Sequence, residues 1–379
     1  MRYTIRHFDL PLLTFEAKVD SADTELHIVK IYEENRTFFP LNLNVSDEDV
    51  EKWLRHRTIP KNRAYVDALL SKVGLSLNRP LGIITVCKGL SLNDCFWVDA
   101  EGSGDTFEKV NLYDNRFSQI LAAIAFTGYG SHVRTSLASS PEFSTNGMLP
   151  KCWRRQNGKI YLYKGGTAGF SNLGFEPYSE LYAYQVAQKM GVNAIQYTLT
   201  KDLKKTLCSK CELFTSKEYS YLSAGELVPK GGMKAVRAYY EMLGQPFVDA
   251  LDDMIVFDAL ICNTDRHLGN FGVLIENKTN TIASPSPLFD HGNSLFSMGG
   301  VDIWENQKEF DAYAKTLLPM LYDDFFTEAK KVLKPRHRAM LHKLLDFHFE
   351  RRATRYNLPQ NRLKMIEKEV RRRASVLLE

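Results

Sequence analysis

The sequence predicts an α+β fold, because strand-like and helix-like patterns dominate different parts of the chain. Short apolar runs typical of strands are frequent up to about residue 215, and apolar residues at helical spacing dominate after it. Strands first and helices later are typical of α+β domains. The 379 residues are 44% hydrophobic and 25% charged, so a folded domain with a core of ordinary density is expected.

The first part, residues 1–135, mixes strand and helix signals. Ser46 and Asp49 have the spacing of a capping box, and Gly128 follows an apolar helical run as a helix-ending glycine. The expected strands are residues 4–8, 14–19, 25–32, 81–86 and 95–98, and the expected helices follow Ser46, Tyr65 and Phe117. Because these residues show no chemical constellation, we predict an accessory or regulatory domain of unknown role.

The second part begins after a Ser- and Thr-rich segment, residues 132–145, which is expected to be a loop or linker. Residues 136–215 are expected to form a smaller, strand-rich part, with strands at 160–164, 194–199 and 207–214 and a helix at 178–190. Residues 216–379 are expected to be mostly helical, with a strong apolar helix at 247–261 and helices from residue 310 to the end.

Charge and hydropathy restrict the classes of function. The net charge of +4, from 49 Lys and Arg against 45 Asp and Glu, does not indicate nucleic-acid binding. The basic tail from residue 351 to 373 is interpreted as a solvated helix face, with a polyanion contact as the alternative. Apolar stretches such as residues 120–126 are too short to span a bilayer.

The N-terminus and the cysteines indicate a cytoplasmic protein. His7 and Asp9 interrupt any apolar run near the N-terminus, so no signal peptide is expected. Six cysteines in such a chain suggest thiols in a reducing compartment. Cys208 and Cys211 form a C-x-x-C pair, but a zinc ribbon needs a second pair, so we interpret them as buried strand residues.

Two neighbouring segments carry the most informative chemistry. Residues 261–271 contain Asp265 and Asn270 directly after an apolar helix, and Asp290 follows across a predicted hairpin. Phosphoryl transfer needs a carboxylate that orients the attacking hydroxyl and hard oxygen ligands for Mg²⁺. Asp265 suits the first role. Asn270 and Asp290 suit the second, since a hairpin can bring their loops together.

An upstream set of residues suits the binding of ATP phosphates. Lys164 ends a strand, Glu180 lies near the start of the next helix, and Gly147 lies in the loop 144–151 that ends at Lys151. A glycine lets backbone N–H groups approach phosphate oxygens. The ordered set of Gly147, Lys164, Glu180, Asp265, Asn270 and Asp290 is more specific than any of its members.

The pattern D-x-H-x-x-N with a second aspartate, preceded by S-x-x-G-x-x-P-K and a strand lysine, resembles the HipA-like family of bacterial serine/threonine kinases. The resemblance covers about residues 140–379. It implies a two-lobed kinase fold, ATP and Mg²⁺ as cofactors, and Asp265 as the catalytic residue. It also implies a hinge at residues 212–214, with Glu212 and Phe214 beside the nucleotide, and a Ser or Thr acceptor on a protein substrate.

The same resemblance implies self-phosphorylation at Ser144 or Thr145, which switches such kinases off, and an antitoxin or other regulatory protein as partner. DNA is then contacted only indirectly, and no membrane is expected. Asp290 lies in Phe-Asp-His-Gly rather than the D-F-G of eukaryotic kinases, a departure that the HipA-like family tolerates. Residues 1–130 fall outside the resemblance, and this leaves the toxin role open.

Several alternatives stay open at this point. His267 is a catalytic candidate, although such a histidine more often braces its loop. His291 beside Asp290 suggests a metal phosphohydrolase, but no further histidines stand at suitable spacing. The acceptor could be a lipid or small molecule, since phosphoinositide kinases share a D-R-H-x-x-N loop. A non-catalytic partner- or DNA-binding regulator is the remaining possibility.

Overall fold

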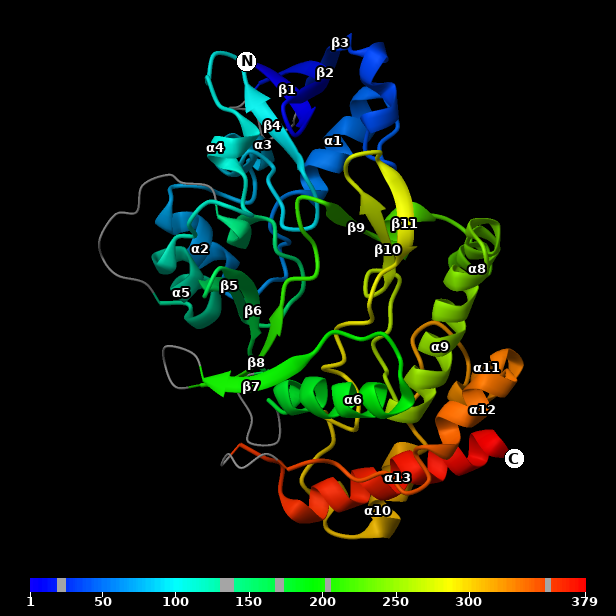
Figure 1. Ribbon diagram of the computed structural model, residues 1–379. Coiled ribbons are helices and arrows are strands. Elements are labelled where there is room, and N and C mark those ends of the chain that lie inside the picture. The colour runs from blue at the N-terminus through cyan, green and yellow to red at the C-terminus, as the bar shows by residue number, and fades with distance from the viewer. Residues whose placement is uncertain (19–24, 130–139, 168–173, 202–205, 352–355) are drawn as a thin grey trace. The chain divides into compact units, whose positions relative to one another are not determined.

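The computed structural model describes residues 1–18, 25–129, 140–167, 174–201, 206–351 and 356–379 (Figure 1). The chain forms two compact units, which are described separately below. Unit 1 contains residues 1–164, 213–222 and 274–283. Unit 2 contains residues 165–212, 223–273 and 284–379.

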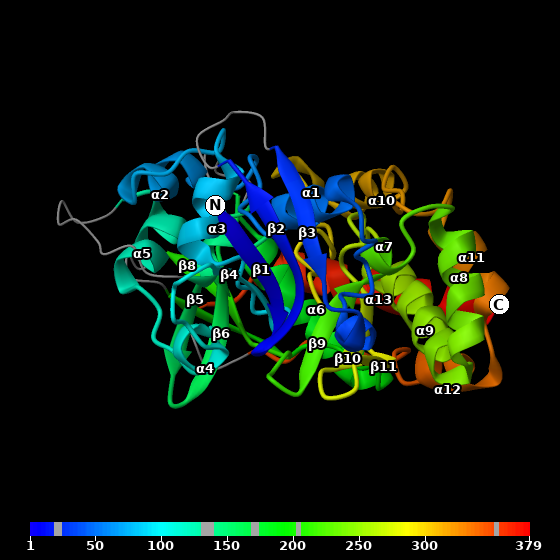
Figure 2. The same cartoon turned by 90° about the horizontal axis from the view of Figure 1, so that it is seen from above.

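Unit 1 begins with an antiparallel sheet whose strand order is β3-β2-β1-β4 (Figure 2). The strands are β1 (Arg2–His7), β2 (Leu10–Ala17), β3 (Leu26–Ile31) and β4 (Phe96–Ala100). In the register, Tyr3 faces Phe15 of β2 and Ala100 of β4. Tyr3 and Ile5 are buried, which is the alternation of a sheet with one face on the core.

Unit 1 also contains short helices. They are η1 (Glu33–Phe38), α1 (Asp47–His56), α2 (Val66–Lys72), α3 (Pro80–Cys87), α4 (Phe107–Val110), α5 (Gln119–Thr127) and η2 (Pro141–Phe143). The Asp49 backbone N–H donates to Ser46 Oγ at 3.1 Å, which confirms the predicted start of α1. Gly128 ends α5 in the left-handed conformation, as expected.

The prediction of a strand at residues 81–86 is wrong, because these residues lie in α3. The run Ile83-Ile84-Thr85-Val86 is rich in β-branched residues, which favours a strand in isolation. Leu81, Ile84 and Cys87 are nevertheless all buried, so this helix shows little of the polar face that identifies a surface helix. Pro80 at its first position is the signal that indicates a helix.

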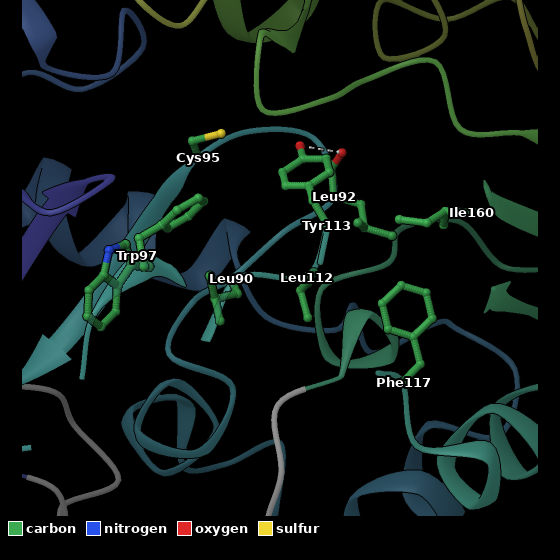
Figure 3. Packing of buried hydrophobic residues seen from close by; sticks show 9 residues of the cluster. Leu90, Leu92, Cys95, Trp97, Leu112, Tyr113, Phe117 and Ile160 are labelled. Atoms are coloured by element: carbon green, nitrogen blue, oxygen red, sulfur yellow. Dashed lines mark hydrogen bonds between the residues drawn. The ribbon is translucent and has the colours of Figure 1, made fainter. Parts of the chain in front are cut away.

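A buried cluster includes Trp97 of β4 and residues from several other parts of unit 1 (Figure 3). Its members are Leu90, Leu92, Cys95, Trp97, Phe107, Leu112, Tyr113, Phe117 and Ile160. The Tyr113 hydroxyl donates to the Leu92 carbonyl at 3.0 Å, so this polar group is satisfied inside the cluster. The cluster therefore draws residues from both the first 135 positions and the strand that ends at Lys164.

Further strands complete unit 1. β5 (Lys151–Gln156) and β6 (Lys159–Lys164) form a hairpin in which Lys151 faces Lys164. Its turn is Asn157-Gly158, both with positive φ, as a tight two-residue hairpin requires. β9 (Tyr219–Ser223), β10 (Gly272–Glu276) and β11 (Thr281–Pro285) form a second sheet in the order β11-β10-β9, most of which belongs to unit 1.

Unit 2 is mostly helical. It contains α6 (Glu176–Met190), β7 (Tyr197–Lys201), β8 (Leu207–Glu212), α7 (Ala224–Leu227), α8 (Gly232–Leu243), α9 (Gln245–Ile261), η3 (Asp302–Trp304), α10 (Gln307–Ala314), α11 (Phe325–Val332), α12 (Pro335–His342) and α13 (Gln360–Leu378). α6 packs on the antiparallel pair β7–β8, and α9 packs against α8, α11 and α13 (Figure 1).

Three further expectations can be compared with the structure. Helix does not continue unbroken from residue 310, since residues 315–324 and 343–351 lie outside α10–α13. Of the predicted linker 132–145, residues 132–139 lie outside the described residues, and the remainder contains η2. Cys208 and Cys211 are buried in β8, and none of the six cysteines, all of which are described, forms a disulfide.

No helix in the described part of the chain combines enough length with enough apolar character to cross a membrane.

We predict that Gly128→Ala destabilises the protein more than Gly74→Ala. Both glycines have left-handed backbones, with φ of +74° and +71°, so each alanine carries the same conformational cost of about 1–2 kcal/mol. A Cβ at Gly128 would lie 2.6 Å from Tyr65 Cδ1, whereas a Cβ at Gly74 would meet no atom within 4 Å. Urea unfolding should show an additional loss of at least about 1 kcal/mol for Gly128→Ala. Equal losses would mean that the Tyr65 ring does not restrict this helix end.

Candidate functional site

The two segments that carry the predicted catalytic chemistry lie side by side in unit 2. α9 ends at Ile261, and its C-cap Cys262, with a φ of +52°, turns the chain out of the helix. The Thr264 backbone N–H and hydroxyl both donate to the Asn293 carbonyl at 3.1 Å. The Leu295 N–H donates to the Ile261 carbonyl at 2.7 Å. The loop after α9 is therefore fixed against the segment that follows Asp290.

Asp265 is half-buried and held by its own loop and by the neighbouring segment. Asn293 Nδ2 donates to Asp265 Oδ2 at 2.9 Å, and the Asp265 N–H donates to Asn263 Oδ1 at 3.1 Å. Asn270 Nδ2 donates to the Asp265 carbonyl at 3.3 Å. Among the described residues nothing donates to Asp265 Oδ1 or to Asn270 Oδ1. Both atoms are oxygen acceptors of the kind that Mg²⁺ binds.

Arg266 connects α9 to the loop of Asn270 and to the segment of Phe289 through hydrogen bonds. It is only 3% exposed and makes two hydrogen bonds to the Asp258 carboxylate, at 2.9 and 3.0 Å. It also donates to the carbonyls of Asn270 and Phe289, at 3.0 and 2.8 Å. Burial acts to lower the pKa of Arg266, but the charges of Asp258, Asp290 and Glu180 outweigh this effect and raise it. The guanidinium therefore stays charged and ties α9 to both loops.

The Asp290 segment is positioned by residues of α6 and β7. Asp290 has a φ of +59°, and its N–H donates to Tyr197 Oη at 3.2 Å. The next N–H, of His291, donates to Glu180 Oε2 at 2.7 Å. Burial, together with the negative charges of Glu180 and Asp290, raises the pKa of Tyr197, so the phenol stays protonated. Glu180 thus contacts the segment that carries Asp290.

The histidines of the site have contacts that suit structural roles. His267 is exposed, and its Nδ1 accepts the Gly269 N–H at 3.0 Å, which is the loop-bracing contact considered above. His291 is fully buried, with its Nδ1 3.1 Å from Arg266. Within the described ranges, no group of three or more His, Cys, Asp or Glu side chains is arranged to hold a metal ion.

The loop of Ser144 and Gly147 belongs to unit 1 and is fixed by a buried ion pair. Arg63 Nη2 lies 2.8 Å from the Glu142 carboxylate, with both side chains 1% exposed, and it also donates to the Lys151 carbonyl at 2.9 Å. Ser144 Oγ donates to the Leu90 carbonyl at 2.7 Å. Gly147 has a φ of +91°, which favours glycine at this position.

The other candidates of unit 1 lie near the β5–β6 hairpin or beyond it. Lys151 Nζ donates to the Asn146 carbonyl at 2.8 Å, and Thr145 Oγ1 accepts Trp153 Nε1 at 2.9 Å. Lys164 is buried at the end of β6, directly opposite Lys151. Phe214 contacts the Tyr221 ring edge-on at 5.5 Å between centroids.

The structure thus gathers the candidates into two sets. Unit 2 brings together Glu180, Asp265, Asn270 and Asp290, with Glu212 at the end of β8. Unit 1 brings together Ser144, Thr145, Gly147, Lys151 and Lys164. Two expected features would link these two sets of residues: the pairing of Lys164 with Glu180 and the hinge at residues 212–214. Both stay predictions.

Sequence reasoning missed residues that hold the candidates in place. Arg266 and Asn293 lie inside the recognised segments, so their positions offered a signal that was not used. Tyr197 offered none, because it lies 93 residues from Asp290 in an ordinary strand.

Comparisons with known proteins identify the fold. No protein-family model matches the sequence, and a search of curated proteins finds no match. HipA of Shewanella oneidensis MR-1, solved in a complex of the toxin–antitoxin system HipA, HipB and its operator DNA, is similar in structure. It has 13% sequence identity and a TM-score of 0.55, and the likeness covers 98% of this chain and 96% of that chain.

The Helicobacter pylori proinflammatory kinase CtkA also matches, at 20% identity and a TM-score of 0.48, over 60% of this chain and 91% of that chain. The likeness to HipA confirms the predicted α+β, HipA-like kinase fold class. Covering 98% of the chain, it extends into residues 1–135, which the sequence resemblance did not include.

We predict that Arg266→Met strongly destabilises unit 2. The substitution leaves the buried Asp258 carboxylate without its ion pair, which typically costs about 3–5 kcal/mol. Arg237→Met is the matched control, because Arg237 also pairs with a buried aspartate but is 30% exposed, and Lys334 remains beside Asp252. This control should lose about 1 kcal/mol or less in urea unfolding. A loss of the same size for both variants would contradict a special role for Arg266.

Proposed function

We propose that this protein is a Mg²⁺- and ATP-dependent kinase that transfers the γ-phosphoryl group to a hydroxyl acceptor. The observation that carries the proposal is the assembly of Asp265, Asn270 and Asp290 around Arg266 in a chain with the HipA-like kinase fold. Phosphoryl transfer depends mainly on positioning and charge stabilisation, and this assembly supplies fixed carboxylate and amide oxygens.

The roles follow from the chemistry of each group. Asp265 orients the attacking hydroxyl and accepts its proton, since its Oδ1 accepts no hydrogen bond from the described residues while Asn293 fixes Oδ2. Asn270 Oδ1 and the Asp290 carboxylate fit Mg²⁺, which would neutralise charge on the phosphates. The loop Gly147–Lys151, Lys164 and Glu180 would hold the phosphates, and Glu212 and Phe214 the base.

The acceptor we propose is a Ser or Thr of a protein. The fold likeness to HipA supports it, as does the resemblance of the Asp265 and Ser144 segments to HipA-like kinases. HipA in the solved structure is part of a complex with HipB and operator DNA. By analogy, we propose a regulatory protein of antitoxin type as the partner, with DNA contacted only through it, and a cytoplasmic location. A lipid or small-molecule acceptor is the alternative within the same chemistry.

We also propose that the kinase phosphorylates itself at Ser144 or Thr145. Ser144 is 8% exposed and donates its hydroxyl proton to the Leu90 carbonyl. A phosphorylated Ser144 would have no proton to donate there, and its charge would face a carbonyl oxygen in a buried position. Phosphorylation therefore requires the loop to leave this position, which would remove Gly147 and Lys151 from the nucleotide.

Asp265→Asn should lower phosphoryl transfer by at least about a hundredfold, because it removes the group that accepts the proton. Wild type and variant are incubated with Mg²⁺ and γ-labelled ATP, and label is located by intact mass and peptide mapping. Asp302→Asn, at an exposed acid of η3, is the matched control and should label as wild type does. Labelling by Asp265→Asn at the wild-type rate would refute the kinase assignment. If wild type shows neither label nor Mg²⁺-dependent ATP binding, the non-catalytic regulator is favoured.

Ser144→Ala should abolish self-inactivation while leaving the initial rate of transfer near that of wild type. The alanine loses one hydrogen bond to Leu90, at a cost of about 1 kcal/mol, but keeps the loop sequence otherwise intact. Transfer is followed over time after preincubation with ATP, and Thr145→Ala is measured in parallel. If preincubation inactivates Ser144→Ala as fully as wild type, Ser144 is not the switch.

A further inference from the structure

Arg362 is a buried arginine of unit 2 whose charge has no acidic partner. Five arginines are buried among the described residues, and four of them pair with a carboxylate. These pairs are Arg57–Asp94, Arg63–Glu142, Arg266–Asp258 and Arg373–Glu369. Arg362 is 4% exposed, yet it forms no ion pair with any described residue. Buried charges are ordinarily paired, so Arg362 is an exception among the buried arginines.

The Arg362 guanidinium lies over two aromatic rings, which leaves the edges of its plane for hydrogen bonds. Its Cζ lies 4.0 Å from the centroid of the Phe175 ring and 4.1 Å from that of Trp304. Its hydrogen bond within the described residues goes from Nη2 to the Phe296 carbonyl at 3.3 Å, and Nε has no partner. Burial lowers the pKa of Arg362 to about 10, so the side chain is still charged at neutral pH.

The same position is the N-terminus of the longest helix of unit 2. α13 has 19 residues, and its N-cap is Pro359, which makes no side-chain hydrogen bond. The N–H groups of Gln360, Asn361 and Arg362 are therefore left without a capping side chain, and they point out of the helix at its positive end. Arg362 and the helix end thus place positive charge in one place.

Both features line a cavity of about 380 Å³. Its described walls include Phe175, Val301, Trp304, Glu305, Pro359 and Arg362. The volume is within the range of sites for small organic ligands, and most of the lining is apolar or aromatic. Glu305 is exposed and forms no ion pair with Arg362, so it does not compensate the charge of Arg362.

We propose that this cavity binds a small organic anion, with a carboxylate or phosphate group on Arg362 and the first turn of α13. The apolar body of the ligand would lie against Val301 and Trp304. Such a site is separate from the roles given to Asp265, Asn270 and Asp290, and it does not depend on the proposed kinase activity.

The test uses the full chain labelled with fluorotryptophan and followed by fluorine NMR, without ATP or Mg²⁺. The protein has four tryptophans, and Trp304 lines this cavity, so its signal reports binding there. The signal is assigned by its loss in Trp304→Phe. The probes are phenyl phosphate, benzoate and the neutral benzyl alcohol. We expect the Trp304 signal to shift saturably with phenyl phosphate or benzoate, and whichever binds more tightly identifies the anionic group.

Two variants at exposed Val301 change the charge at the cavity without a large effect on the stability of the fold. Val301 is 64% exposed, so polar side chains are tolerated there. Val301→Glu should weaken binding of the anion by about tenfold or more through charge repulsion. Val301→Gln introduces a neutral side chain of the same size as glutamate and should weaken binding by less than about threefold. Arg362→Met should abolish the shift. No saturable shift with either anion, equal binding of benzyl alcohol, or unchanged binding by Arg362→Met would overturn the proposal.

Discussion

The charge of Arg266 is the constraint on which the candidate site depends. A buried guanidinium must be compensated, and Asp258, within the last turn and a half of α9, supplies both carboxylate oxygens. The remaining donors then reach the carbonyls of Asn270 and Phe289, one on each side of the site. Satisfying one charge therefore fixes the loop of Asp265 relative to the segment of Asp290. The hydrogen bonds of Asn293, Tyr197 and Glu180 refine that arrangement.

The same physical device recurs in unit 1. Arg63 pairs with Glu142 in a nearly inaccessible position and donates to carbonyls on either side of the Ser144–Gly147 loop. The loop is thereby anchored at both ends, while its centre is held by weaker contacts such as Ser144 to Leu90. Such a loop has one firmly defined position, so a phosphate on Ser144 would conflict with the contacts that define it. Arg362 departs from the pattern, and this departure is the reason to expect an external anion there.

Local sequence signals predicted those parts of the fold that depend on residues close to one another in sequence. The cap at Ser46, the end of α5 at Gly128 and the buried positions of Cys208 and Cys211 all follow from residues close in sequence. The strand expected at residues 81–86 was wrong because β-branched residues favour a strand locally, and burial in the tertiary structure overrode that preference. The break between α10 and α11, in contrast, has local signals that the prediction did not use, since Pro319 lies in it and Asp324 caps the start of α11.

The sequence by itself determined the order and spacing of Asp265, Asn270 and Asp290, because hydroxyl activation and metal binding require particular side chains at short separations. It also determined the α+β class, through the change from strand to helix periodicity. Only the tertiary structure decided which groups hold those residues in place. Tyr197 reaches Asp290 across 93 positions and Glu180 reaches His291 across 111, and no local pattern encodes such contacts. Whether a buried charge finds a partner, as Arg266 does and Arg362 does not, is likewise settled by packing, since it depends on every element around the side chain.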